Sequence, residues 1–216
     1  MATKLDLRKE LKYLCSPSAK KPEVVEVPEF NFLMLDGVVA PGTPVAEVPG
    51  FQEALQALYG ISYTLKFAAK NDKDNPVDYP VMGLEGLWWI EEGLFDFAKK
   101  VPWHYTLLMM QPEFITAEQV EAARQQVIKK RGGSPELEQV RFEPFREGRC
   151  VQILHIGPFA DEPRTLAVMD AYAAEHGYTY RGKHHEIYLS DFRKTAPENL
   201  KTILRHPLED QKTGQS

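Results

Sequence analysis

Two short stretches of this sequence place acidic and aromatic side chains close together. These residues are Glu85, Trp88 and Trp89 in LEGLWW, and Glu186 and Tyr188 in KHHEIY. A carboxylate that is desolvated among aromatic rings has a raised pKa, so it can act as a base or as the partner of a cation. Aromatic faces beside it would hold a flat molecule by stacking. The two stretches are therefore candidates for a binding or catalytic site.

Strand alternation limits which of these side chains can act together. Both stretches have the composition of strands, in which successive side chains point to opposite faces. Glu186 and Tyr188 then share one face, whereas Ile187 and Leu189 share the other. If helices cover the Ile187 face, Glu186 is simply solvated. If helices cover the other face, Glu186 lies among aromatic groups, and both alternatives stay open at this point.

The adjacent tryptophans raise the same question about the first stretch. Alternation places Glu85 and Trp89 on one face and Trp88 on the other. One indole can therefore join a core while the other lines a surface or a cleft. The sequence does not decide which indole does which.

A predicted helix over residues 51–70 carries a second set of aromatic side chains. Tyr59, Tyr63 and Phe67 repeat at every fourth residue, next to an aliphatic stripe that includes Leu58 and Leu65. One interpretation is a single wide apolar face. The other is that the aliphatic stripe packs on a sheet while the aromatic stripe borders a cleft, where tyrosine hydroxyls can reach water.

Composition and motifs exclude several classes of function. The net charge is −5 and the pI about 5.7, and the densest basic run, residues 129–131, suits a helix C-terminus better than a nucleic-acid interface. No Cys/His cluster has metal-ligand spacing, and no glycine pattern has the context of a phosphate-binding loop. No run of about 20 apolar residues predicts a membrane span, and the N-terminus does not resemble a secretory signal. We expect a cytoplasmic protein without metal or cofactor.

The elements that must position these residues form an internal repeat. A strand, a helix and two strands are predicted twice, so that FLMLDG corresponds to QILHIG and LLMMQP to TILRHP. In this alignment Glu85 and Glu186 occupy similar places. Two βαββ units predict an α+β fold: one mostly antiparallel sheet with helices on one face and a cleft between the halves.

One domain over residues 1–208 accommodates this repeat. Its predicted parts are an N-terminal helix and extended arm (1–28), a first repeat (29–113), a connector helix (116–131) and a second repeat (140–208), followed by a disordered tail (209–216). The connector helix begins with a capping box formed by Thr116 and Gln119. Its apolar stripe is thin, which is typical of a connector.

Seven segments together resemble the GyrI-like small-molecule-binding family over nearly the whole chain. They are NFLMLDG, LYGISYTLKF, LEGLWW, MMQPEFIT, LHIGPF, RGKHHEIYLSD and APENLKTILRHP, of which LEGLWW and KHHEIYLSD are the specific ones. Within the family the chain resembles a stand-alone branch, the cyclopropanoid cyclopropyl hydrolases. No helix-turn-helix is present, so a regulator role is not supported.

The resemblance implies a cleft that binds flat aromatic xenobiotics and an enzyme that opens the strained ring of duocarmycin-type compounds with water. Glu186 would orient or deprotonate the water, and Tyr188 or Tyr63 would donate to the developing phenolate oxygen. The implied substrate-binding residues are Trp88, Trp89, Tyr63, Phe67, Trp103 and Glu85. The expected partner is a planar aromatic small molecule, with no nucleic acid, membrane or protein partner inferred. A binding protein without chemistry is the alternative, and haem binding is a weaker one that the scattered histidines do not support.

Overall fold

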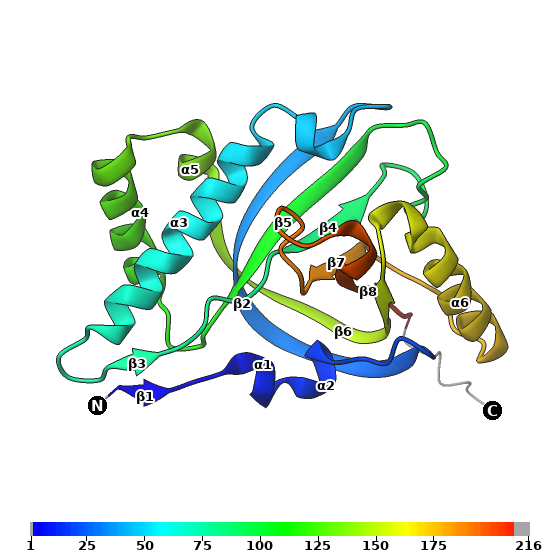
Figure 1. Cartoon of the computed structure of the whole chain (residues 1–216), viewed down its shortest axis with the longest axis horizontal. Helices are drawn as coiled ribbons and strands as arrows, with labels where there is room; N and C mark the ends of the chain where they lie inside the picture. The colour runs from blue at the N-terminus through cyan, green and yellow to red at the C-terminus, as the bar shows by residue number, and fades with distance from the viewer. Residues whose placement is uncertain (1, 210–216) are drawn as a thin grey trace.

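Six antiparallel strands form the framework of the computed structural model, which describes residues 2–209 (Figure 1). Neighbouring strands follow one another in the order β2 (Glu23–Val39), β5 (Trp103–Gln111), β4 (Glu85–Trp89), β7 (His184–Tyr188), β8 (Lys201–Pro207) and β6 (Arg141–Ile156), and β6 pairs with β2 to close the ring. The predicted α+β class with a mostly antiparallel sheet is confirmed. Closure of the sheet is an addition that the sequence pattern did not predict.

The two longest strands, β2 and β6, allow the ring to close. Residues 23–34 of β2 pair with β6, and residues 31–39 pair with β5, so one strand serves both halves. Strand β2 thus begins within the stretch expected to be an extended arm. Strand β6 bends at Gly148, whose φ of +77° favours glycine. A short parallel pair, β1 (Thr3–Lys4) with β3 (Val77–Asp78), lies apart from the ring.

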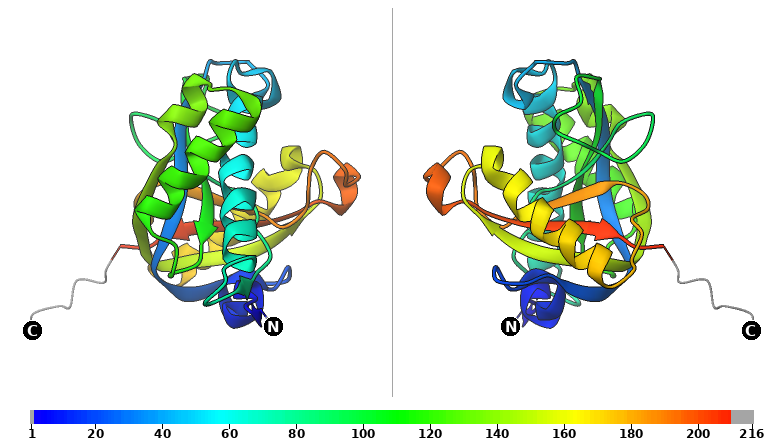
Figure 2. Two further views of the ribbon diagram at one scale, coloured as in Figure 1. Left: turned by 90° about the vertical axis from the view of Figure 1, so that its left-hand side faces the viewer. Right: turned by 90° about the vertical axis from the view of Figure 1, so that its right-hand side faces the viewer.

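Four helices flank the sheet at its two ends. Helices α3 (Phe51–Lys70), α4 (Ala117–Arg131) and α5 (Pro135–Gln139) gather on one side and α6 (Glu162–Glu175) on the other (Figures 1 and 2). The aliphatic stripe of α3 packs on β2 and β5, and α6 packs on β6 and β8. We call the face of the sheet that they cover the helix face.

Helix α4 is anchored at its start and along one side. The capping box is present: Thr116 N donates to Gln119 Oε1 at 2.9 Å, and Gln119 N donates to Thr116 Oγ1 at 3.3 Å. Its three buried residues, Val120, Ala123 and Val127, join the same core as α3. The thin apolar stripe therefore packs α4 against α3.

The opposite side of the sheet is covered by the N-terminal segment, and we call it the arm face. The single N-terminal helix expected from the sequence is two short helices, α1 (Leu7–Glu10) and α2 (Lys12–Cys15), separated at Leu11, whose ψ of 34° leaves the helical range. Leu7 and Leu11 pack on a cluster that includes Phe32 and Leu108. Apart from Glu209, the predicted tail lies outside the described residues.

No helix within residues 2–209 has both the length and the apolar character needed to cross a membrane.

Candidate functional site

Glu186 lies on the helix face of the sheet and is almost completely buried. Its partners across the two neighbouring strands are Gly86 on β4 and Leu204 on β8. Gly86 in turn pairs with Leu107, which packs in the core under α3. The side chain is only 5% exposed. Of the two alternatives left open by the sequence, the structure therefore selects the one in which Glu186 lies under the helix layer.

Trp88 and Tyr188 accompany Glu186 on this face. Trp88 Nε1 donates to the Tyr188 hydroxyl at 3.2 Å. A Cβ atom at Gly86 would lie 2.8 Å from Trp88 Nε1 and 3.0 Å from the Tyr188 hydroxyl, so only glycine leaves room for this pair. Trp88 is thus the indole beside the carboxylate.

A second carboxyl group, Glu162, lies close to Glu186. It sits in the first turn of α6 and is completely buried, and neither of its oxygens has a hydrogen bond of good geometry with a described residue. Burial, reinforced by the charge of Glu186, raises its pKa to about 10, and the nearby Thr202 hydroxyl opposes this only weakly. Glu162 is therefore protonated at neutral pH.

Two buried histidines, His184 and His206, lie beside this carboxyl pair. His184 Nε2 lies 3.2 Å from Glu186 Oε1 but forms no hydrogen bond of acceptable geometry. Its other nitrogen, Nδ1, lies 2.9 Å from His206 Nε2. Burial, followed by the charge of His184, lowers the pKa of His206 to about 3, so His206 is neutral. Burial and the charge of Glu186 also raise the pKa of Tyr188 well above its usual range, which keeps its proton in place.

Aromatic rings from the loops cover this group of polar side chains. Phe95 stacks on His184 with ring centroids 5.6 Å apart and planes 4° from parallel. Phe159 and Phe192 pack edge-on against Tyr188 at 5.9 and 6.3 Å. Trp103 lies 5.3 Å from Phe95 and so contributes to the same cover. These rings make a low-dielectric surrounding for the carboxyl pair.

A cleft of about 1060 Å³ opens beside the covered carboxyl pair. Its walls are the aromatic stripe of α3, the end of α4 and residues 81–84 and 188–194. Tyr63 and Phe67 are 48% and 53% exposed, so the stripe borders the cleft while the aliphatic residues of α3 pack on the sheet. Tyr188 lines the cleft and also contacts Glu186, so it connects the open space to the buried site.

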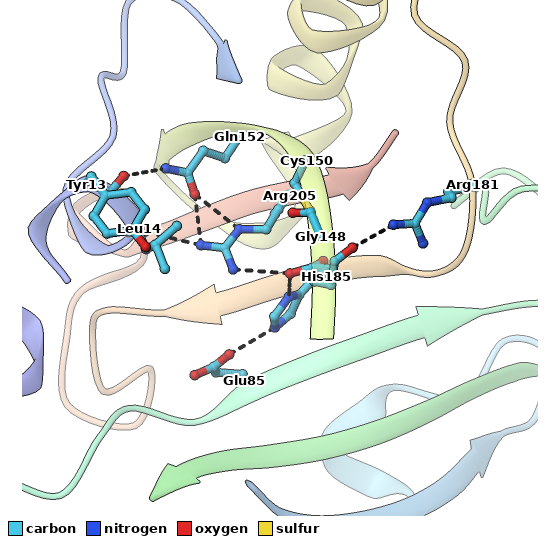
Figure 3. A network of polar contacts seen from close by, with 10 residues as sticks. Tyr13, Leu14, Glu85, Gly148, Cys150, Gln152, Arg181, His185 and Arg205 are labelled. Atoms are coloured by element: carbon cyan, nitrogen blue, oxygen red, sulfur yellow. Dashed lines mark hydrogen bonds and ion pairs between the residues drawn. The ribbon is translucent and has the colours of Figure 1, made fainter. Parts of the chain in front are cut away.

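Glu85 and Trp89 lie on the arm face and are not brought together with Glu186. Glu85 Oε2 lies 3.0 Å from His185 Nε2, and His185 Nδ1 lies 3.0 Å from Glu147 Oε2 (Figure 3). Trp89 stacks on His104 at 5.5 Å and carries the Lys183 ammonium 3.3 Å above its ring.

Arg205 completes this arm-face network. Its guanidinium donates to Glu147 Oε2 at 3.2 Å, to Gln152 Oε1 at 2.8 Å and to the carbonyl of Leu14 in α2 at 3.2 Å (Figure 3). Burial alone would raise the pKa of Glu147, but His185 and Arg205 lower it to about 2. Burial alone would lower the pKa of His185, but Glu147 and Glu85 raise it to about 9. The network is thus a set of mutually compensated charges.

Three kinds of site residue were missed by sequence reasoning. Glu162 lies in the first turn of α6, directly after Asp161, which makes no side-chain capping bond. Phe95 and Phe192 lie in loops without periodicity, and His184 was set aside with the scattered histidines. Only the position of Glu162 in the first turn of a helix carried a signal, and that signal has an ordinary explanation in the macrodipole.

Within residues 2–209, no trio of histidine, cysteine or acidic side chains is placed to hold a metal ion.

Comparison with protein families matches residues 20–209 to the GyrI-like small molecule binding domain. The chain belongs to the GyrI-like family. The match spans both halves of the sheet and therefore both the cleft and the carboxyl pair of this GyrI-like domain.

Three solved structures from Listeria innocua resemble this GyrI-like chain closely. An uncharacterized conserved protein is 40% identical, with a TM-score of 0.84 over 95% of this chain and 100% of its own. Two hydrolases are 37% and 39% identical, with TM-scores of 0.80 and 0.82 over 95% and 96% of this chain and 100% of their own. A search of curated proteins found no match. The structural neighbours give weak support to hydrolysis and none to a particular substrate.

Proposed function

We propose that this protein binds flat aromatic xenobiotics in the cleft and hydrolyses electrophilic cyclopropanes among them, as a detoxifying enzyme. The observation that carries the proposal is the carboxyl pair of Glu186 and Glu162, which is buried behind the aromatic cleft and in which Glu162 has no hydrogen-bond partner among the described residues. Two neighbouring acidic groups are costly to bury, so a pair of this kind opposes folding unless it has a function. Perturbed pKa values of this kind cluster at functional sites.

The proposed reaction adds one water across a strained carbon–carbon bond. The water oxygen attacks the cyclopropane methylene, the ring bond breaks, and its electron pair moves into the cyclohexadienone to give a phenolate. The water proton passes to the Glu186 carboxylate, while the Tyr188 hydroxyl donates a hydrogen bond to the developing phenolate oxygen. General base catalysis of this kind contributes roughly 10²–10⁴-fold. Protonated Glu186 then gives this proton to the phenolate through solvent, so the phenol forms and the Glu186 carboxylate is restored.

Binding without chemistry is the second candidate. It is favoured by the size of the cleft, about 1060 Å³, which can hold a planar molecule while the rings of Phe95, Phe159 and Phe192 stay closed over the carboxyl pair. In that case a planar dye would quench tryptophan fluorescence saturably and would be recovered unchanged.

The test is incubation with a duocarmycin-type compound and mass spectrometry for the gain of one water. Wild type should turn the compound over faster than buffer alone does. The Glu186→Gln variant should be slower than wild type by roughly 10²–10⁴-fold. Glu198→Gln is the matched control, because Glu198 is exposed in a surface turn. Turnover at the buffer rate by wild type would reject the enzyme. Equal turnover by wild type and Glu186→Gln would reject only the role of Glu186.

A further inference from the structure

Cationic side chains from three distant parts of the chain surround the cleft. They are Arg8, Lys130, Arg131, Arg193 and Lys194, and within residues 2–209 the one acidic side chain that lines the cleft with them is Asp191. All five cationic residues are exposed. The cleft is thus strongly positive in a protein whose net charge is −5.

The single acidic residue is already committed to two of these cations. Asp191 accepts from Arg193 Nε at 2.9 Å and from Arg193 Nη2 at 3.1 Å, and Lys194 Nζ lies 3.6 Å from it. Arg193 also extends over the ring of Tyr59, 5.8 Å from its centroid. Arg8 contacts the carbonyl of Val81 at 3.4 Å. Among the described residues, Arg8 forms no ion pair, so its charge remains uncompensated.

Two of the cations have a simpler explanation that accounts for only part of the pattern. Lys130 and Arg131 lie in the last turn of α4, where cations stabilise a helix through its macrodipole. That explains their presence in the helix. It explains neither why this end of α4 faces the aromatic stripe nor why Arg8 and Arg193 converge on the same space. Lys130 and Arg131 likewise have no ion pair among the described residues.

We propose that the cleft selects flat aromatic molecules that carry a negative charge, such as a carboxylate, sulfonate or phenolate, and disfavours planar cations. The inference rests on the proposed binding function of the cleft and adds the charge of its ligand. Charges of one sign in a cleft with low-dielectric walls focus the field and concentrate ligands of the opposite sign. The rings of Tyr59, Tyr63 and Phe67 provide the stacking surface, and the cations provide the selection.

A pair of xanthene dyes tests the charge preference at constant shape. Fluorescein is an anion at pH 8 and rhodamine 123 is a cation, and both share the same flat tricyclic ring system. We expect fluorescein to bind wild type on the order of tenfold more tightly at low ionic strength, with a gap that narrows at 1 M salt. The readout is fluorescence polarisation during titration with protein.

Charge-reversal variants locate the effect. The double variant Lys130→Glu, Arg131→Glu should abolish or invert the preference. The double variant Lys20→Glu, Lys21→Glu changes the net charge equally at an exposed turn whose residues do not line the cleft. It should leave the dye preference within about twofold, because solvent and salt weaken the field of exposed charges that do not touch the ligand.

The outcomes separate this inference from the proposed function. Tighter binding of rhodamine 123, equal binding of both dyes, or an equal shift in both double variants overturns the charge selection and leaves the cleft as a binding site. If neither dye binds, the cleft itself is rejected as the site, and the charge selection is rejected with it. The hydrolysis assay with Glu186→Gln is independent of these results.

Discussion

The two faces of the sheet carry similar residues in opposite electrostatic situations. On the arm face, His185 lies between Glu85 and Glu147, and Arg205 completes the set. On the helix face, the adjacent His184 lies near Glu186 without a proper hydrogen bond, and Glu162 has no partner. The pKa of Glu147 falls to about 2, whereas that of Glu162 rises to about 10.

The difference shows how buried charges can be assigned to stability or to chemistry. Charges that compensate one another keep their protons in one fixed arrangement and therefore contribute to stability. The arm-face network contributes in this way by linking strands β4, β6, β7 and β8 to helix α2. On the helix face the pKa of Glu162 is strongly raised instead, and perturbed carboxyl groups of this kind are typical of catalytic acids and bases. The comparison therefore predicts that variants on the arm face reduce stability and that variants on the helix face reduce activity.

The largest expected effect on stability is that of Arg205→Met. It leaves the Glu147 carboxylate buried with one partner fewer and removes the bonds to Gln152 and to Leu14. Breaking a buried ion pair from one side costs about 3–5 kcal/mol. Urea unfolding measures this loss. Arg146→Met is the control, because Arg146 pairs with Glu26 at the surface and both side chains are more than half exposed. This variant should lose less than about 1 kcal/mol in free energy of unfolding.

Glu162→Gln is expected to stabilise the protein at neutral pH. A carboxyl group whose folded pKa is raised keeps its proton in the folded state but loses it on unfolding, so it costs stability as the pH rises above the unfolded value of 4.5. The glutamine amide keeps the shape of the side chain without this cost. The free energy of unfolding should therefore rise by about 3 kcal/mol at pH 7 and be unchanged near pH 4. Unfolding curves at both pH values, with turnover measured in parallel, check this. A variant that loses both stability and turnover at pH 7 would contradict the division between the faces.

Periodicity predicted the elements and half of the site. Alternation correctly placed Trp88 and Trp89 on opposite faces of the sheet. The spacing of four residues between Tyr59 and Tyr63 correctly defined an aromatic stripe on α3. Such patterns depend only on local backbone geometry, which the sequence expresses directly. The layer that covers each face of the sheet is a tertiary property, so alternation could not choose between a buried and a solvated Glu186.

The alignment of the repeats shows where local reasoning ends. Glu85 and Glu186 occupy similar places in the two halves, yet in the structure Glu186 pairs with Gly86 and Glu85 pairs with Ile187. A shift of one residue in a strand moves a side chain to the opposite face. That single residue separates a carboxyl group in a compensated network from one in the carboxyl pair. Glu162 had no partner in the pattern, because its neighbour Glu186 comes close only in three dimensions.

The pH dependence of stability sharpens the comparison in the Glu162→Gln background. His185 has a folded pKa raised to about 9, so its contribution is complete below its unfolded value of 6.5 and is lost as the pH rises through 9. Glu147 contributes fully above 4.5 and loses its contribution only as the pH falls toward 2. We expect the free energy of unfolding of the Glu162→Gln variant to fall by about 2 kcal/mol as the pH rises from 6.5 to 9. Adding His185→Gln should remove this slope, and a slope that persists would assign it to another group.

The smallest effect, and the one that separates the faces most cleanly, is that of Trp89→Phe. The change weakens the contact with the Lys183 ammonium, 3.3 Å from the ring, at a cost of about 0.5–1 kcal/mol in urea unfolding. Trp89 lies on the arm face, so turnover and dye affinity should equal those of wild type. Trp88→Phe instead removes the donor to the Tyr188 hydroxyl beside Glu186, so turnover should fall. If both variants lowered turnover equally, the face on which a side chain lies would not decide its role, and the division between the two networks would lose its functional meaning.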